Sequence, residues 1–439
     1  MKVSNAIKLF TSQLARNLTL VFAGNFLAAG LGFLSVLIIS RALSVSDFGL
    51  FNMAISVILI VPYLATLGMD TSMIKFASSY LSTGKITEAT QVFRETLFVR
   101  VITSTIIAIV IYSTAPLLSK RIFHYPNLVP LIRLAAFGVL SVPLFNYVKS
   151  ALYIYRLFKD CVMLQLLVDF AKLFTVGILI FSLKLNTFSA VAVFTFIPLL
   201  GVLFGFWQIR PKLFSKGKSP RSLFGQLLSY SKWVFVSNVC ATLFLYIAIF
   251  MLAKMLGIKA TGIYGLALNL TYIFPIIIIS LKSVLLPEVS RFSEIAQFEK
   301  YIKGSLKISL FLTVLVIPFL FISEKIIPCF FGSRYLDSVA IFNWLLLSYI
   351  FRTISSPIRS ALYSLNKPHI IAFVELFRVT AMILGCYLLI PSFGILVPAV
   401  LALIINVSVL GFLILYVFKY IHQEKVVFQK EELAELTWL

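Results

Sequence analysis

The stretch VFAGNFLAAGLGFLSVLIIS, residues 21–40, carries no charged residue. It is long enough to cross the hydrocarbon core of a bilayer as one helix. The whole chain resembles it: 60% of the residues are hydrophobic, 12% are charged, and the mean hydropathy is +1.02. Soluble domains are roughly a quarter charged. We therefore predict an all-α polytopic membrane protein.

Apolar runs of spanning length recur along the chain and predict twelve transmembrane helices. They cover residues 17–40, 48–69, 97–117, 128–147, 162–183, 188–208, 233–253, 262–281, 308–323, 338–351, 370–391 and 393–418. The first run is longer than the apolar part of a secretory signal, and no cleavage site follows it. We therefore expect it to be retained as a helix.

The opening stretch also begins an internal duplication. VFAGN (21–25) returns as VFVSN (234–238), and the same offset places Gly49 on Gly262. These two glycines are expected to allow a tight turn or close packing.

Two more pairs follow in the same order: VKSALY (148–153) with IRSALY (358–363), and VDFAK (168–172) with VELFR (374–378). This order predicts two parallel six-helix repeats. The expected parts are an N-terminal bundle (1–209), a cytoplasmic linker (210–232), a C-terminal bundle (233–420) and a cytoplasmic tail (421–439).

The formal net charge of +22 follows a topological pattern. Most of the 38 basic residues fall in the tails and in the loops on the same side as the tails. The opposite side receives Arg41, Lys120, Arg121, Arg133, Lys184, Lys254, Lys259, Lys325 and Arg334. This bias predicts that both termini are cytoplasmic. The excess charge is therefore attributed to topology and to anionic headgroups, and nucleic acid is not expected as a partner.

The cysteines and histidines give no sign of a cofactor. Cys161, Cys240, Cys329 and Cys386 are scattered without CxxC spacing, and the three histidines stand apart from other ligand types. We expect neither a metal site nor a disulfide.

An enzyme is also disfavoured. The acids on the predicted outer side, Asp47, Glu324 and Asp337, are isolated from one another in short segments.

Four segments resemble a known family. They are IISRALSVSDFGLFN (38–52), ATLGMDTSMIKFASSY (65–80), YGLALNLTYIFPIIIISLKSVLLPEVSRF (264–292) and LNKPHIIAFVELFRVTAMILGCYLLIPSFGILVPA (365–399). They are similar to polysaccharide (O-antigen type) flippases of the multidrug/oligosaccharidyl-lipid/polysaccharide exporter superfamily. This resemblance implies a V-shaped bundle with a central cleft that opens alternately to each side of the membrane.

The resemblance also implies a substrate and a location. The substrate would be undecaprenyl-diphosphate-linked oligosaccharide, moved to the outer leaflet of the bacterial inner membrane for O-antigen or exopolysaccharide synthesis. The protein would be monomeric, and its candidate protein partners are a polymerase or glycosyltransferases. The lipid II branch fits less well, because the first helix has no interior charge and the tail cannot span. A cation-coupled multidrug extruder of the same superfamily is the alternative.

VDFAK and VELFR place an acid and a base three residues apart inside predicted spans. A lone charge exposed to lipid there costs at least about 2.5–3.5 kcal/mol, so these side chains must face protein or water. One interpretation is an ion pair that only lowers the cost of burial. The other is a substrate site, with Lys172 and Arg378 binding the diphosphate. Asp169 and Glu375 would hold the two cations, or take up a coupling proton or sodium ion.

Four further polar residues are candidates for substrate binding. Asn25 and Asn238 occupy equivalent positions in the first and seventh helices and would bind sugar hydroxyls or bridge helices. Lys149 and Arg359 lie near the cytoplasmic ends of the fourth and tenth helices. They would anchor those ends or capture headgroups.

Overall fold

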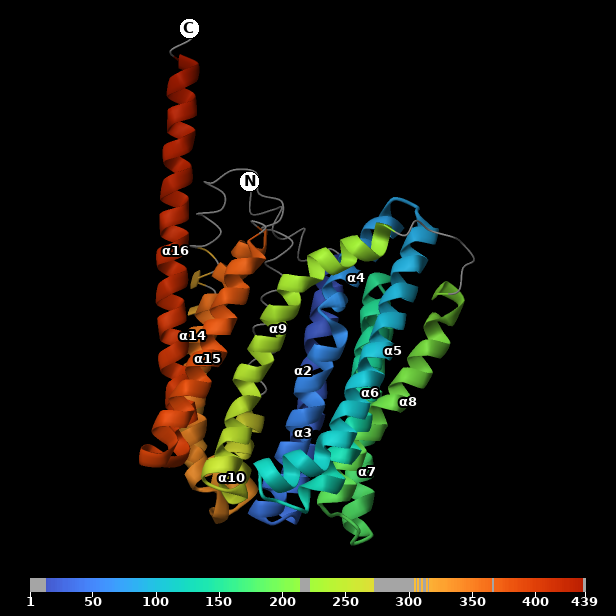
Figure 1. The fold of residues 1–439 in the computed structure, drawn as a ribbon, viewed down its shortest axis with the longest axis vertical. Helices are drawn as coiled ribbons and strands as arrows, with labels where there is room; N and C mark the ends of the chain where they lie inside the picture. Colours follow the sequence, from blue (N-terminus) through green and yellow to red (C-terminus); the bar gives the residue numbers. More distant parts are fainter. Residues whose placement is uncertain are drawn as a thin grey trace.

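A computed structural model describes residues 13–213, 222–271, 316–364 and 367–436, together with 304, 306–307, 309–310 and 313–314. All regular secondary structure in these residues is helical (Figure 1). The first half contains α2 (Gln13–Ala42), α3 (Val45–Thr66), α4 (Met69–Ser82), α5 (Ile86–Pro116), α6 (Leu128–Ile154), α7 (Phe158–Phe181) and α8 (Thr187–Leu213). The second contains α9 (Ser222–Met255), α10 (Ile258–Leu270), α13 (Ile317–Phe331), α14 (Asp337–Ser364), α15 (Pro368–Phe393) and α16 (Val397–Leu436). Short helical turns η1 (Leu117–Ile122), η3 (Ser333–Tyr335) and η4 (Gly394–Leu396) join some of them.

The predicted fold class is confirmed: the chain is an all-α polytopic membrane protein. Within the described residues, nine stretches are long and apolar enough to cross a membrane, and one of them, His369–Val417, runs from α15 into α16. A helix satisfies its own backbone hydrogen bonds, which lipid cannot do, so apolar runs of this length fold as helices. The predicted runs 262–281 and 308–323 lie partly outside the described residues.

Two features differ from the expected organisation. Backbone φ angles of 49° at Leu67 and 71° at Gly68 separate α3 from α4, a helix that was not predicted. The linker expected over 210–232 is entered by helices from both sides, because α8 runs to Leu213 and α9 begins at Ser222.

Helix packing repeats between the two halves. In the first half α2 packs along α7 and α6 packs along α8. In the second half their counterparts pair in the same way, α9 along α15 and α14 along α16 (Figure 1). This agrees with the duplication seen in the sequence. The V shape and the central cleft stay predictions.

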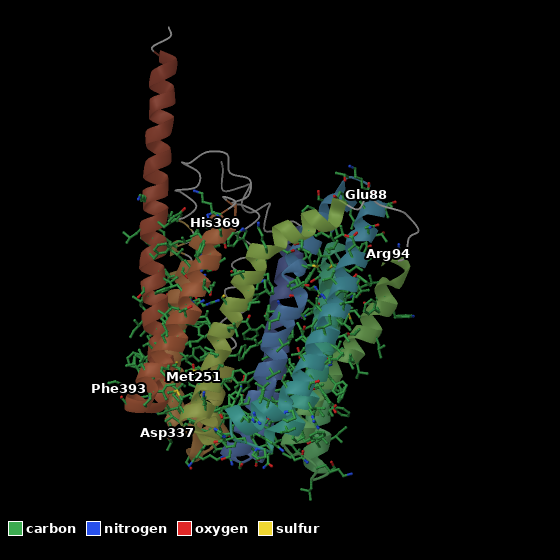
Figure 2. The ribbon with its side chains drawn as sticks, viewed as in Figure 1. Glu88, Arg94, Met251, Asp337, His369 and Phe393 are labelled. Carbon is green, nitrogen blue, oxygen red and sulfur yellow. The ribbon has the colours of Figure 1, made fainter. Side chains whose placement is uncertain are left out.

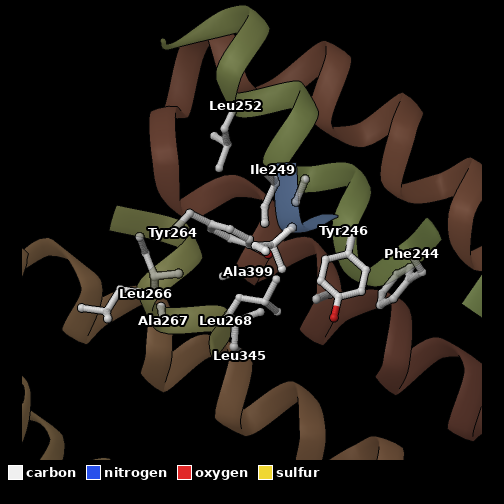
Figure 3. Close-up of a cluster of buried hydrophobic side chains, with 14 of the residues drawn as sticks. Phe244, Tyr246, Ile249, Leu252, Tyr264, Leu266, Ala267, Leu268, Leu345 and Ala399 are labelled. Carbon is white, nitrogen blue, oxygen red and sulfur yellow. The ribbon is translucent and has the colours of Figure 1, made fainter. Parts of the chain in front are cut away.

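Apolar side chains from several helices of the second half meet in one buried cluster (Figure 3). Its members include Ile249, Leu252, Tyr264, Leu268, Leu345 and Ala399. Because α9, α10, α14 and α16 all contribute, the cluster holds together helices that are far apart in sequence.

The two halves meet where α3 crosses α10. A Cβ atom at Gly49 would clash with the carbonyl oxygen of Ile258, and one at Gly262 would clash with the carbonyl oxygen of Val45. Val45 and Ile258 are themselves equivalent positions of the repeat. Reciprocal contacts between equivalent residues are the mark of a local two-fold axis. The predicted close packing at these glycines is therefore confirmed, and it occurs between the halves.

The bundle has two distinct ends. The α10 end is where α3, α10 and α14 begin, and the α4 end is the opposite one, where α7 and α15 begin (Figure 1). Figure 2 shows Asp337 at the α10 end, with Glu88 and His369 toward the α4 end. The predicted topology makes the α10 end the outer side.

At the α10 end, each half contributes an arginine to a helix terminus of the other half. Arg41, near the end of α2, donates hydrogen bonds to the carbonyls of Cys329 and Phe330, near the end of α13. Arg334 donates to the carbonyls of Ser40 and Arg41, the second at 2.9 Å. The last carbonyls of a helix have no partner within it, and a cation there also interacts favourably with the helix dipole. We call these contacts the cross-half caps.

Two tyrosines add to the cross-half caps. The Tyr125 hydroxyl, from the first half, accepts a hydrogen bond of 3.0 Å from the backbone N–H of Ile258, at the start of α10. The Tyr335 hydroxyl, from the second half, donates one of 3.3 Å to the carbonyl of Ser40. Opening the α10 end would therefore leave helix termini in both halves without these partners.

Candidate functional site

One buried ionic cluster joins α6 and α7 in the first half. Lys172 Nζ lies 2.9 Å from Asp169 Oδ1, and the Gln165 amide donates a hydrogen bond to the other oxygen of Asp169. Lys149 Nζ on α6 donates to Gln165 Oε1 at 2.9 Å. Gln165, Asp169 and Lys172 share one face of α7, because residues three and four apart are neighbours on a helix. These four residues form the first-half cluster.

Aromatic rings lie against both lysines of the first-half cluster. The ring centroid of Phe194, on α8, is 5.5 Å from Lys172 Nζ, and that of Phe145 is 4.7 Å from Lys149 Nζ. A cation at such distances is attracted by the ring. The side chains of Lys172 and Asp169 are 18% and 11% exposed, so the pair is largely screened from the surroundings.

A second ionic cluster joins α14 and α15 in the other half. Glu375 accepts a hydrogen bond from Arg359 on one carboxylate oxygen and from Arg378 on the other. Arg378 is fully buried, and its guanidinium lies 3.9 Å from the ring centroid of Phe244 on α9. One carboxylate thus accepts hydrogen bonds from two arginines on different helices.

The structure brings together residues that the sequence treated separately. Lys149 and Arg359, the equivalent residues of VKSALY and IRSALY, each reach the cluster built on the acid–base pair of their own half. The interpretation of Arg359 as a surface anchor is wrong, because its side chain is 9% exposed and is paired with Glu375. Each cluster lies among helices of one half.

Arg352 completes the second-half cluster and was missed by the sequence analysis, which assigned it to a cytoplasmic loop. It lies inside α14, seven residues (two helical turns) before Arg359, and is close enough to Glu375 and Arg378 to interact with them electrostatically. The duplication could not have revealed it, since its equivalent in the first half is Val142. The second-half cluster is therefore Arg352, Arg359, Glu375 and Arg378.

The two asparagines lie on the helices next to the clusters. Asn25 on α2 and Asn238 on α9 are both partly buried. In the part of the chain that the structure describes, neither side chain joins a cluster. Beside Asn25, Gly24 fits against Val162 of α7, where a Cβ atom would clash. The proposed contact of the asparagines with sugar stays a prediction.

A third buried charge was not anticipated. Arg100 on α5 is 1% exposed, pairs with Asp70 of α4 and donates a hydrogen bond of 2.8 Å to the carbonyl of Pro143. Its guanidinium lies 5.3 Å from the ring centroid of Tyr147. The two charged residues are thirty positions apart on separate helices, so no sequence spacing indicates the pair. These contacts hold α4, α5 and α6 together.

The charged groups of the two clusters are of the kind that bind anions. Among the described residues, no group of three or more His, Cys, Asp or Glu side chains is placed to hold a metal. The four cysteines are free thiols. The clusters instead offer lysine and arginine groups that could exchange a carboxylate partner for another anion.

Comparison with known proteins gives the family. The model of the family described as "Polysaccharide biosynthesis protein" matches residues 38–340. The chain belongs to this family. A putative O-antigen transporter of Shigella flexneri is 22% identical over 216 residues, which are 48% of this chain and 51% of that protein. The match thus spans about half the length of this curated relative.

Solved structures share the fold. A multidrug resistance MATE family transporter of the MOP superfamily, in an inward-facing conformation, superposes with a TM-score of 0.72 at 14% identity. That match covers 90% of this chain and 95% of the transporter. The lipid II flippase MurJ, in an inward closed conformation, gives a TM-score of 0.71 at 15% identity and covers 91% and 87%.

Proposed function

We propose that this protein is a transporter that flips an undecaprenyl-diphosphate-linked oligosaccharide from the cytoplasmic to the outer leaflet of the bacterial inner membrane. The observation that carries the proposal is the pair of equivalent, cationic clusters buried in the membrane helices of a polysaccharide biosynthesis protein. The first-half cluster contains two lysines and one aspartate, and the second-half cluster contains three arginines and one glutamate. Both clusters therefore favour an anionic ligand.

Binding would proceed by exchange of anions. In the empty protein, Asp169 holds Lys172, and Glu375 holds Arg359 and Arg378. A diphosphate offers several strong acceptors, and arginine can bind it through two parallel hydrogen bonds. The ligand would replace part of the carboxylate contact while the carboxylates keep their other partners. The same carboxylates are the groups we propose for coupling to a proton or sodium ion.

In an alternating-access mechanism, the cross-half caps would keep one end of the transporter closed. The two halves are tied at the α10 end by Arg41, Arg334, Tyr125 and Tyr335. If both termini are cytoplasmic, this closed end faces outward, so the substrate would be loaded from the α4 end. Release to the outer leaflet would then require these caps to break.

A cation-coupled multidrug extruder is the second candidate, favoured by the similarity in fold to the MATE transporter. Cationic drugs call for an excess of acidic groups at the binding site. Each cluster here has an excess of basic groups, so we place the lipid-linked oligosaccharide first. We infer transport rather than an enzymatic reaction, a monomeric protein, and a polymerase or glycosyltransferases as the proteins that act on the same lipid.

The test is translocation of a radiolabelled undecaprenyl-diphosphate oligosaccharide in proteoliposomes. The variant is Lys172→Ala/Arg378→Ala, with Arg94→Ala, an exposed arginine on α5, as the matched control. The double variant should fold, because Asp169 keeps its bond from Gln165 and Glu375 keeps its pair with Arg359. Thermal unfolding and gel filtration check this.

We expect the wild-type protein and the control to flip the lipid and the double variant to lose most of the activity. Normal flipping by a folded double variant would reduce the two ion pairs to a structural role. If the wild-type protein flipped no lipid-linked oligosaccharide but exported a cationic dye, the drug-extruder function would replace this proposal.

A further inference from the structure

The second-half cluster offers more hydrogen-bond donors than its carboxylate can accept. Glu375 is bonded to the guanidinium groups of Arg359 and Arg378 in the described structure, and that of Arg352 lies within electrostatic reach of it. Four of their nitrogens are buried and lack a partner in the described part of the chain: Arg352 Nη1, Arg359 Nη2, Arg378 Nε and Arg378 Nη2. A buried donor without an acceptor is costly, and more so when it is charged.

The first-half cluster differs in this respect. Gln165 lies between Lys149 and Asp169: it accepts a hydrogen bond from Lys149 and donates one to Asp169. None of the buried side-chain nitrogens or oxygens of these residues, or of Lys172, lacks a partner in the described structure. The described structure thus leaves buried nitrogens without a partner in the second-half cluster and not in the first-half cluster. From the duplication alone, the two clusters would be expected to have equivalent residues. They differ because Gln165 is present only in the first-half cluster and Arg352 only in the second-half cluster.

We propose that the second-half cluster is the oxyanion site for the phosphate-type group, and that Arg352 is the residue that completes it. This rests on the proposed function and deepens it, because it assigns the phosphate-type group of the substrate to one half. The cluster carries three positive charges and one negative, which matches a ligand with two negative charges. The unpartnered nitrogens come from α14 and α15, so the ligand would be held between these helices.

The geometry also separates the roles of the three arginines. Arg359 and Arg378 are each held by Glu375, and Arg378 is further packed against Phe244. Arg352 forms no ion pair among the described residues, and its side chain is only partly buried. It can therefore turn toward a ligand without breaking a salt bridge. This makes Arg352 the best single position for a test, since its substitution leaves the pairs of Glu375 in place.

Two parts of a lipid-linked sugar carry oxyanions: the diphosphate, and the carboxylate of an acidic sugar. Both accept bidentate hydrogen bonds from arginine. Binding should be measured on the full-length protein in phosphatidylcholine nanodiscs with three probes. They are undecaprenyl diphosphate without sugar, undecaprenol, and a soluble oligosaccharide of glucuronic acid. The variants are Arg352→Gln, Arg352→Lys and, as the control in the other half, Arg94→Gln at an exposed arginine of α5.

We expect the wild-type protein to bind undecaprenyl diphosphate and not undecaprenol. Arg352→Gln should weaken that binding about tenfold or more, the effect of losing one charge-assisted contact. Arg352→Lys should recover part of it, and Arg94→Gln should change it by less than about threefold. If Arg352 instead affects only the glucuronic acid oligosaccharide, the oxyanion site stands and its ligand is the sugar carboxylate.

The inference is overturned if Arg352→Gln binds both anionic probes as the wild type does, or if Arg94→Gln and Arg352→Gln weaken binding equally. Such a result would leave the proposed function intact as long as the wild-type protein flips lipid-linked oligosaccharide. The proposed function itself would be refuted by a separate result: that the wild-type protein flips no lipid-linked oligosaccharide.

Discussion

Removing the cross-half caps should open the α10 end. Arg334 donates two hydrogen bonds to the last carbonyls of α2, and Arg41 donates two near the end of α13. A hydrogen bond from a charged group contributes roughly 1.5–3 kcal/mol when buried, and a cation at a helix C-terminus about 0.3–1 kcal/mol. Because Arg41 is exposed, solvent screens its charge, and we take about 1 kcal/mol in total for each arginine.

The expected change in the open-to-closed ratio is therefore about 5-fold for Arg41→Gln or Arg334→Gln alone, and about 30-fold for the double variant. The assay is electron–electron double resonance between spin labels at Phe181→Cys and Phe393→Cys. These exposed positions lie at the α10 end, one in each half, and the native cysteines would be replaced by alanine. The double variant should show a new population at longer distance.

Arg133→Gln is the matched control. Its guanidinium lies 5.0 Å from the ring centroid of Tyr112, in the same half, so its loss should leave the distance distribution unchanged. The reasoning is refuted if the double variant has the wild-type distribution, or if Arg133→Gln opens the end to the same extent.

Two further predictions concern stability. Gly49→Ala should lower the thermal unfolding temperature in detergent, because the added Cβ would clash with the carbonyl oxygen of Ile258. Gly30→Ala on α2, which has open space around it, should leave that temperature unchanged. Equal effects of the two substitutions would contradict the close packing of α3 on α10. Arg100→Gln should cost about 1–3 kcal/mol in the same unfolding assay, because it removes the hydrogen bonds of a buried arginine to Asp70, whose side chain is 34% exposed, and to the carbonyl of Pro143. Arg100→Gln/Asp70→Asn should recover part of this, and no recovery would show that the ion pair is not the cause.

The sequence by itself determined the elements of this protein and their repetition. Lipid cannot hydrogen-bond to the backbone, so an apolar run of sufficient length must be a helix, and composition alone gave the fold class. The duplication of VFAGN, VKSALY and VDFAK predicted which helices correspond. It also indicated the acid–base pairs of α7 and α15, because charges inside such runs are too costly to be incidental.

Only the tertiary structure decided which residues act together. Arg352 has no counterpart in the first half, and Gln165 none in the second, so the repeat could not indicate how the two clusters differ. Arg100 meets Asp70 because α4 turns away from α3 at Leu67 and Gly68, a break set by local backbone geometry.

The cross-half caps were equally hidden, since Arg41 and Arg334 are nearly three hundred residues apart and look like ordinary loop charges. Their partners are backbone carbonyls at helix ends. Every helix has such carbonyls, so no particular residue type marks them in the sequence. Which end receives which arginine depends on how the two halves pack, and that packing is fixed by long-range contacts such as Gly49 on α10. Local sequence determines the helices, while their assembly determines the site.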